Sequence, residues 1–404
     1  MVSRRVAWSV ALAATFTMTV SYIDRTTLAV LAPSVTKALD ISETAYGWLA
    51  SAFSVAYLLA TPLSGWWIDR IGARRGLVWS VLVWTSIAAL HAVVPGFAVL
   101  FVLRIALGMA EGPSFPGAAQ TIQRVLPPQD RERGFGVLFT GSSIGGMIAP
   151  PLASALYAFA GWRVAFVGTA IAGLVWVPVW LWVTRRTEVR AQMDGAPAVA
   201  ADAPQRATFR QLVGHPIMVR ALFAILAVAS IGGFSLGWGA KYLHKTFGVE
   251  QAAIGQYLWL PAVMFDAGAV LFGDLASRQV RPPGVPPRLL FSIAIPFAAS
   301  LALLPFATTP WNAMIVLGAA MIGSGAIYTF VTADLLARVP PASVSLSGGV
   351  MAGAQSLALI IVNPLIGWSV DVHGHYDIVA WSLGALVVPG SIVWLVWRPR
   401  AFGA

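Results

Sequence analysis

Four ionisable residues lie inside long apolar segments of this sequence. Asp24 and Arg25 interrupt one such segment, and Arg104 and Glu111 interrupt another. A charge in the core of a bilayer costs about 2.5–3.5 kcal/mol on insertion scales, and such residues persist mainly where they face one another or a water-filled cavity. These acids and arginines therefore predict a pathway for a proton or a charged solute.

The spacing of Arg104 and Glu111 suits proton coupling. The two residues are seven apart, so about two helical turns place them on one face. Pro113 and Pro116 follow, and we expect them to kink the helix just beyond Glu111. A carboxylate held between an apolar setting and an arginine can gain and lose a proton as water and substrate come and go. Asp24, Glu111 and Arg104 are the candidates for proton coupling, with either acid as the proton carrier, and a structural ion pair between helices is the alternative.

Twelve apolar segments are long enough to position these residues within a membrane. A spanning helix needs about 20 mostly apolar residues. The segments are residues 7–33, 46–68, 77–94, 97–118, 135–159, 162–183, 217–242, 253–276, 289–307, 311–336, 346–370 and 378–397. They predict an all-α membrane protein.

The composition agrees with a membrane protein and excludes several kinds of chemistry. Of the 404 residues, 58% are apolar and only 10% are charged, whereas soluble proteins carry about 25% charged residues. There is no cysteine, so disulfides, thiolate metal sites and cysteine catalysis are excluded. His373 and His375 form an isolated HxH pair, which is weak evidence for a metal site. We expect neither a metal nor a cofactor.

The distribution of Lys and Arg predicts the orientation of the chain. Arginines cluster in alternate loops and at both ends, whereas few basic residues fall on the other side: Lys37, Arg163, Lys241 and Lys245. The positive-inside rule then places both termini and the central linker in the cytoplasm of a bacterial cell, with the protein in the inner membrane. The asymmetry accounts for the net charge of +10. It predicts attraction to anionic membrane lipid and no nucleic-acid partner.

The two halves of the sequence resemble each other. Residues 124–128 read RVLPP and residues 338–341 read RVPP, at an offset of 214. The duplication predicts two pseudo-symmetric six-helix bundles, at residues 1–184 and 216–404, joined by a polar and partly disordered cytoplasmic linker at 185–215.

Four stretches carry a resemblance to a known family. Residues 65–75 read GWWIDRIGARR, which resembles the GxxxDRxGRR signature of the major facilitator superfamily. Residues 21–25 (SYIDR) and 103–116 (LRIALGMAEGPSFP) resemble its anion:cation symporter family. Residues 140–151 (TGSSIGGMIAPP) are similar to the hexuronate and sugar-acid carriers of that family, which also includes sialin-like relatives. The resemblance covers nearly the whole chain.

The resemblance implies roles for the charged residues. In such symporters the acids that match Asp24 and Glu111 couple transport to protons. Arg25, about 100° around the helix from Asp24, is then the residue that binds the substrate anion, because its planar fork suits a carboxylate. Arg104 is left to pair with Asp24 or Glu111. The helix 5 antiporter motif GxxxGPxxG is not present in that form, which favours symport.

Further polar residues complete the predicted binding site. Tyr22 and Tyr57 are candidates for binding substrate hydroxyl groups, with an ordinary buried tyrosine as the alternative. Ser143 and Gln355 are weaker candidates, because packing polar residues are common between membrane helices. Lys241 either contacts the entering anion or snorkels to the surface.

Two other sets of charges are assigned provisionally. Asp266 is a third acid within an apolar segment, with functional and structural readings both open. Asp69, Arg70 and Arg74 are expected to gate the cytoplasmic side, with Asp69 pairing in the outward-open state to arginines of the loop between the fourth and fifth or the tenth and eleventh predicted helices. A merely solvated turn is the alternative.

These features predict a secondary active transporter that takes up an organic anion by proton-coupled symport, acting as a monomer. The anion is expected to be a sugar acid or another monocarboxylate. An uncoupled facilitator or an anion exchanger of the same fold is the nearest alternative. A membrane enzyme lacks a GxSxG, HExxH or CxxC motif in this sequence, and a pore lacks the repeated filter or charge rings of channels.

Overall fold

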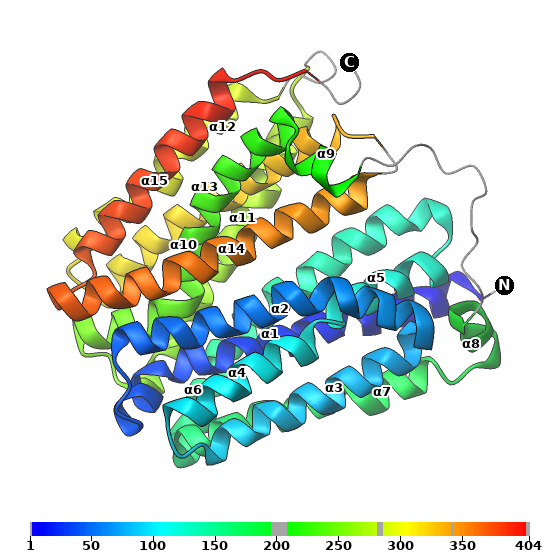
Figure 1. Cartoon of the computed structure of the whole chain (residues 1–404), viewed down its shortest axis with the longest axis horizontal. Coiled ribbons are helices and arrows are strands. Elements are labelled where there is room, and N and C mark those ends of the chain that lie inside the picture. Colours follow the sequence, from blue (N-terminus) through cyan, green and yellow to red (C-terminus); the bar gives the residue numbers. More distant parts are fainter. Residues whose placement is uncertain (1, 195–207, 281–285, 341–342, 401–404) are drawn as a thin grey trace. The chain divides into compact units, whose positions relative to one another are not determined.

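The computed structural model describes residues 2–194, 208–280, 286–340 and 343–400, and throughout these residues it contains helices and no strand (Figure 1). The predicted all-α fold is confirmed. Part of the predicted linker, residues 195–207, lies outside the described residues. The remainder of the linker includes two short helices, α8 (Thr187–Asp194) and α9 (Phe209–Val213).

The chain forms two compact units. The first comprises Met1–Pro197 and Gly239–Trp259, and the second comprises Ala198–Trp238 and Leu260–Ala404. The end of α10 and the start of α11 therefore pack with the first unit. The division of the chain into bundles at 1–184 and 216–404 stays a prediction.

Eight α-helices make up most of the first unit. They are α1 (Arg4–Ala38), α2 (Glu43–Ile71), α3 (Ala73–Leu90), α4 (Phe97–Glu111), α5 (Ser114–Val125), α6 (Pro128–Leu174), α7 (Trp176–Val183) and α8 (Thr187–Asp194), with a 3₁₀ turn η1 at His91–Val93. Contacts join α1 to α6, α2 to α4 and α3 to α6, and these helices run side by side along their lengths in Figure 1.

The remaining helices form the second unit, except for the end of α10 and the start of α11. They are α9 (Phe209–Val213), α10 (Pro216–Phe247), α11 (Gly255–Ser277), α12 (Arg288–Ala299), α13 (Pro310–Leu336), α14 (Val344–His373) and α15 (Asp377–Val396), with 3₁₀ turns η2 (Gln251–Ala253) and η3 (Ser300–Phe306). In the second unit α13 contacts α12, α14 and η3, and α15 contacts α12 and η3.

Eleven helical stretches among the described residues are long and apolar enough to cross a membrane. One of them, Pro128–Val183, is 56 residues long, nearly three times the roughly 20 residues that a bilayer requires. The backbone leaves the helical conformation at Ala160 and at Gly161, whose φ of +80° favours glycine. This stretch therefore accounts for two of the twelve predicted segments.

The helix containing Arg104 breaks immediately after its acid, as predicted. α4 ends at Glu111, Gly112 and Pro113 form the connection, and α5 begins at Ser114. Proline lacks a backbone N–H and cannot continue the hydrogen-bond ladder. The break places the Glu111 carboxylate at the end of α4.

Glycines set the closest helix contacts in the first unit. A Cβ atom on Gly108 would stand 2.5 Å from the carbonyl oxygen of Phe53, and one on Gly112 would stand 3.0 Å from the Ala60 Cβ. These two glycines, four residues apart, bring α4 against α2. Small residues at this spacing allow backbones to approach closely in membrane helices. Gly145 brings α6 equally close to the Thr19 carbonyl of α1.

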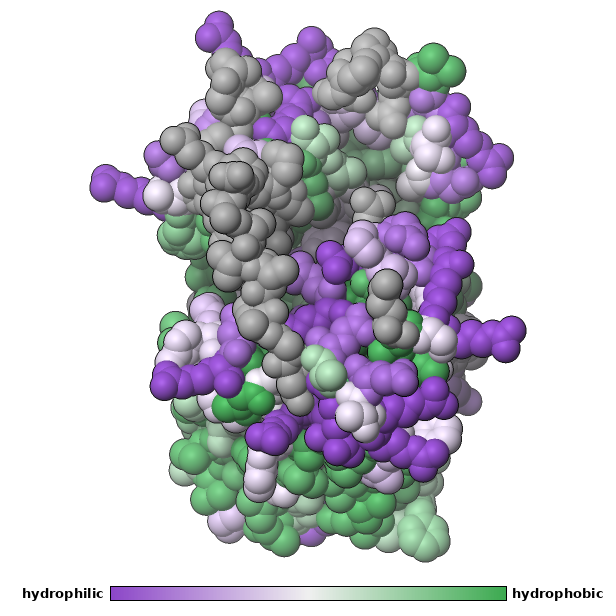
Figure 2. Space-filling view, turned by 90° about the vertical axis from the view of Figure 1, so that its right-hand side faces the viewer, coloured by the Kyte–Doolittle hydropathy of each residue, from purple (hydrophilic) through white to green (hydrophobic). Residues whose placement is uncertain are grey.

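Large apolar side chains cover much of the helix surface. Leu59, Leu63, Trp79 and Val102 are among the exposed ones, as expected for surfaces in contact with lipid tails. Figure 2 faces the end at which Figure 1 shows the N-terminus and α8, and hydrophilic residues gather there.

Candidate functional site

An ion pair joins Arg25 of α1 to Glu111 at the end of α4. Arg25 Nη2 lies 3.0 Å and Arg25 Nε 3.2 Å from Glu111 Oε2, which also accepts a hydrogen bond of 2.7 Å from the Ser21 hydroxyl. The Glu111 side chain is fully buried, whereas that of Arg25 is 20% exposed. The arginine is thus the member of the pair that a solute can reach.

Three aromatic rings surround the guanidinium of Arg25. Its Cζ lies 4.6 Å from the ring centroid of Tyr22, 4.7 Å from that of Phe53 and 4.5 Å from that of Tyr57. We call Tyr22, Phe53 and Tyr57 the aromatic cage. Each contact is within the range of a cation–π interaction. The predicted tyrosines therefore meet the predicted anion-binding arginine, although it is their ring faces that contact it.

Arg104 does not take the partner expected from the sequence. Glu111 is the acid whose charge acts on it most strongly, yet within the described residues Glu111 pairs with Arg25 instead. Arg104 is buried, its Nε has no hydrogen-bond partner among the described residues, and its Cζ lies 4.8 Å from the ring centroid of Phe53. Arg25, one turn after Ser21 on α1, instead occupies the same Glu111 oxygen as the Ser21 hydroxyl.

Asp24 is buried without a partner for either carboxylate oxygen in the described part of the chain. The Trp84 indole of α3 lies beside this carboxyl. A Cβ on Gly173 of α6 would stand 3.3 Å from Asp24 Oδ2. No cation pairs with this carboxylate in the described part of the chain, and a buried ionised carboxylate without an ion-pair partner is costly.

Three weaker candidates belong to three other helices. Ser143 of α6 is half-buried, as is Asp266 of α11. Gln355 of α14 is half-buried in the second unit, where its side chain interacts with the hydroxyl of Tyr328 on α13. The sequence analysis did not single out Tyr328, and the only signal for it was its position within an apolar segment.

Lys241 lies in the part of α10 that belongs to the first unit. Its ammonium is 3.0 Å from Glu43 Oε2 at the start of α2 and donates a hydrogen bond of 2.8 Å to the Thr36 hydroxyl of α1. It also lies 5.2 Å from the ring centroid of Tyr46. The side chain is only 6% exposed, so Lys241 does not snorkel to the surface.

Asp69 is hydrogen-bonded to a glutamine of α5, and its pairing with loop arginines in an outward-open state stays a prediction. Gln120 Nε2 of α5 donates a hydrogen bond of 2.6 Å to Asp69 Oδ1, and Gln120 Oε1 accepts one of 3.1 Å from the backbone N–H of Ala73. Gln120 thus ties together the two sides of the turn between α2 and α3. It was missed because a single amide in the sequence carries no signal of its own.

The two arginines near this turn differ in their surroundings. Arg74 Nε donates to the Thr184 hydroxyl at 3.2 Å, and the Arg74 carbonyl accepts from the Trp180 indole at 3.1 Å. Arg70 is exposed and lies over the ring of Trp66. Arg74 is therefore held by the end of α7, and a gating role for either residue stays a prediction.

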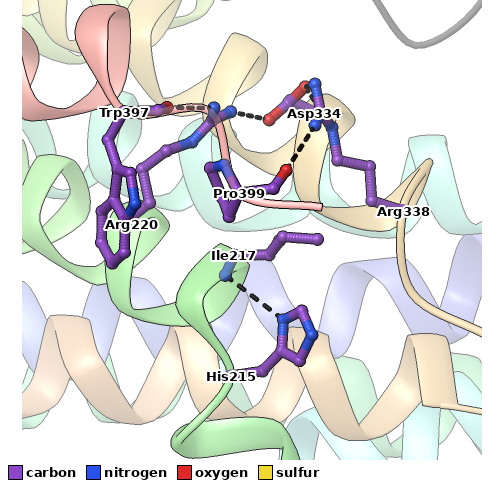
Figure 3. Close-up of polar contacts among 7 residues, drawn as sticks. All are labelled: His215, Ile217, Arg220, Asp334, Arg338, Trp397 and Pro399. Atoms are coloured by element: carbon purple, nitrogen blue, oxygen red, sulfur yellow. Dashed lines mark hydrogen bonds and ion pairs between the residues drawn. The ribbon is translucent and has the colours of Figure 1, made fainter. Parts of the chain in front are cut away.

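The second unit contains a buried ion-pair cluster that the sequence did not reveal. Figure 3 shows the Asp334 carboxylate between the side chains of Arg220 and Arg338. Asp334 Oδ2 pairs with Arg220, and Asp334 Oδ1 lies 2.9 Å from Arg338. Arg220 Nη1 also donates a hydrogen bond of 2.9 Å to the Trp397 carbonyl, and Arg220 Cζ lies 4.8 Å from the ring centroid of Trp394.

His215 caps the start of α10 close to this cluster. Its Nδ1 accepts a hydrogen bond of 3.3 Å from the backbone N–H of Ile217 (Figure 3). Partial burial lowers the pKa of His215 below its usual value, which favours the neutral ring that can accept this bond.

An arginine in each unit binds the chain that follows the unit's last spanning helix. Arg124 Nη1 donates to the Met193 carbonyl in α8, and Arg338 Nη1 donates to the Pro399 carbonyl after α15 at 3.4 Å. Arg124 and Arg338 are the two arginines of the repeated RVLPP and RVPP motifs. We call these two contacts the closing contacts.

No group of three or more histidine or acidic side chains that could hold a metal occurs among the described residues. His375 Nδ1 instead lies 3.2 Å from Asp377 Oδ2 in an exposed pair.

Comparison with known proteins gives a consistent result. The sequence profile of the Major Facilitator Superfamily matches residues 14–361. The chain is 27% identical over 388 residues to the hexuronate transporter of Bacillus subtilis (strain 168), covering 92% of this chain and 90% of that protein. It is 28% identical over 263 residues to the galacturonate transporter of Dickeya chrysanthemi, covering 62% of this chain and 76% of that protein.

A solved structure resembles the fold over almost its full length. This is the crystal structure of a bacterial homolog of the human lysosomal transporter Spinster in an inward-facing, unoccupied conformation. It superposes with a TM-score of 0.74 at 21% identity, covering 98% of this chain and 96% of that one.

Proposed function

This chain belongs to the Major Facilitator Superfamily and is a multi-pass membrane transporter, and on that premise we propose that it carries an organic anion by symport with a proton. The anion we propose is a sugar acid of the hexuronate or aldonate type. Relatives that include hexuronate and galacturonate transporters support this class of substrate.

The observation that carries the proposal is the Arg25–Glu111 pair within the aromatic cage. Arg25 combines a planar fork of N–H donors with partial exposure, which suits it to receive a carboxylate. Its present partner is a carboxylate, so a substrate carboxylate can replace Glu111 with little change in geometry. Tyr22 and Tyr57 stand beside the same guanidinium, and in this proposal their hydroxyl groups bind hydroxyls of the sugar acid.

Proton coupling follows from the competition for Arg25. Protonation of Glu111 removes the charge that holds Arg25, and the arginine then becomes free to bind the substrate anion. Asp24, buried without a partner in the described part of the chain, is the second acid of the cycle, and Arg104 adds positive charge close to Glu111. Release of the substrate to the cytoplasm allows Glu111 to lose its proton and pair with Arg25 again.

This cycle fits alternating access between two bundles. We propose that the bundles at 1–184 and 216–404 rock about the bound anion, in a monomer of the bacterial inner membrane with both termini in the cytoplasm. Ser143, Gln355 and Lys241 are the further substrate contacts of this proposal. Asp69, Arg70 and Arg74 govern closure on the cytoplasmic side, and Asp266 is a reserve site for the proton.

The test uses purified protein in liposomes. Counterflow with a panel of hexuronates, aldonates and simple monocarboxylates identifies the substrate, and an imposed pH gradient shows whether the proton drives accumulation. We expect counterflow with a sugar acid and accumulation when the outside is acidic. We expect Arg25→Lys to abolish binding because lysine keeps the charge but loses the planar fork. Counterflow without accumulation would identify an uncoupled facilitator or an anion exchanger.

A further inference from the structure

Phe53 contacts both arginines of the charged site. The centroid of its ring lies 4.7 Å from Arg25 Cζ and 4.8 Å from Arg104 Cζ. The first arginine comes from α1 and the second from α4, whereas Phe53 belongs to α2. A single uncharged side chain therefore links two cations that repel each other.

The fold fixes this ring firmly. Phe53 is only 4% exposed and stacks on Tyr57 with the ring centroids 5.9 Å apart and the planes at 13°. Its backbone carbonyl is in close contact with Gly108, which lies between Arg104 and Glu111 on α4. The absence of a side chain at Gly108 thus allows α4 to lie close to α2. This close approach brings Arg104 beside the ring.

The chemistry of the contact leaves the arginine free to bind an anion. A cation–π contact uses the flat face of the guanidinium, whereas hydrogen bonds to a carboxylate use the N–H groups at its edge. Arg25 can therefore exchange Glu111 for a substrate carboxylate while the ring contact persists. Aliphatic side chains of similar size would fill the space but would offer no negative ring face.

We infer that Phe53 is a positioning residue for substrate recognition, whose ring holds Arg25 and Arg104 in the orientation that receives the anion. This inference rests on the proposed role of Arg25 in binding a carboxylate. The ring contributes to the affinity for the anion without touching it, since it acts through the arginine.

The experiment compares Phe53→Leu, Phe53→Tyr and wild-type protein in counterflow. Cation–π contacts that are shielded from water contribute on the scale of a factor of ten in affinity. We expect Phe53→Leu to raise the KM for the sugar acid about tenfold with a smaller change in the maximal rate. Phe53→Tyr keeps the ring and should stay close to the wild-type KM.

A second series separates ring charge from shape. Fluorinated phenylalanines placed at position 53 weaken the negative ring face step by step while leaving the ring in place. We expect log KM to rise with each added fluorine. Phe101→Leu on α4 serves as the control, because Phe101 pairs with the ring of Phe97 and has no cation–π contact among those described for Arg25 and Arg104. It should leave the KM unchanged.

The outcomes separate two failures. A KM that is insensitive to fluorination, or equally raised by Phe53→Leu and Phe53→Tyr, overturns the role of the ring while leaving the transport proposal intact. A wild-type protein that neither binds nor transports any carboxylate overturns the proposed function, and this inference with it.

Discussion

Gly108 lies so close to Phe53 that a methyl group on the glycine would stand 2.5 Å from the phenylalanine carbonyl oxygen. Real Cβ atoms do not approach an oxygen this closely, so any larger residue must move α4 away from α2. Because Arg104 and Glu111 flank Gly108 on α4, that movement displaces the arginine and the acid of the proposed site together.

The first prediction concerns this contact. Gly108→Ala should lower the free energy of unfolding by about 1–3 kcal/mol through overpacking, and it should reduce transport severely. Thermal unfolding in detergent and counterflow measure the two effects. Gly136→Ala on α6 is the matched control, since a Cβ there meets nothing within 4 Å. That control should be neutral or slightly stabilising, and equal behaviour of the two variants would count against the close contact.

The second prediction concerns proton coupling. Glu111→Gln mimics the protonated acid and frees Arg25, so counterflow should persist while accumulation driven by a pH gradient is lost. Asp24→Asn should lose driven accumulation as well, with weaker binding because Arg25 is adjacent. Glu188→Gln, an exposed acid of α8, is the control and should behave like the wild type. If both Glu111→Gln and Asp24→Asn still concentrate substrate, the proton site lies elsewhere and Asp266 is tested next.

The third prediction concerns the buried cluster of the second unit. Asp334→Asn leaves Arg220 and Arg338 without their acid, and the loss of one partner of a buried pair costs about 3–5 kcal/mol. The matched control is Asp274→Asn, because the Asp274–Arg278 pair is largely exposed and should contribute at most about 1 kcal/mol. Thermal unfolding ranks the two variants. A similar small shift for both would mean that the Asp334 cluster does not stabilise the fold.

The fourth prediction separates the two roles of Lys241. Lys241→Met removes the ion pair with Glu43, so it should lower the unfolding temperature and raise the KM for the anion. The charge-swapped double variant, Lys241→Glu with Glu43→Lys, should recover the unfolding temperature but not the KM. Recovery of both properties would show that Lys241 has a structural role only.

Sequence patterns predicted the helices and the break at Glu111 because hydropathy and proline act locally. Twenty apolar residues span a bilayer whatever their neighbours, and Pro113 weakens the helix locally because it lacks a backbone N–H. These features require no knowledge of what lies beside them, and the structure confirms both.

The pairing of the charges was beyond the sequence because it depends on how each helix is rotated against its neighbours. Arg25 and Arg104 were both plausible partners for Glu111. The choice between them is set by helix contacts such as those of Gly108 with α2 and of Gly145 with α1. The sequence alone does not show which helix such a glycine will contact. Phe53 was missed for the same reason.

The cluster around Asp334 was missed for a different reason. Arg220 and Arg338 were counted as cytoplasmic charges that set the orientation, which implies a hydrated side chain. Both are held by one acid, and Arg220 is almost completely buried. A rule based on counting residues at the membrane boundary cannot distinguish an arginine in water from one that is folded inward.

The closing contacts have a consequence for the segments that they hold. Arg124 and Arg338 occupy the same place in the two repeats, yet their acceptors, the carbonyls of Met193 and Pro399, lie in segments of unrelated sequence. A hydrogen bond to a backbone carbonyl oxygen does not depend on the side chain of the residue that accepts it. Substitutions in either segment therefore leave its closing contact in place as long as the backbone keeps its course.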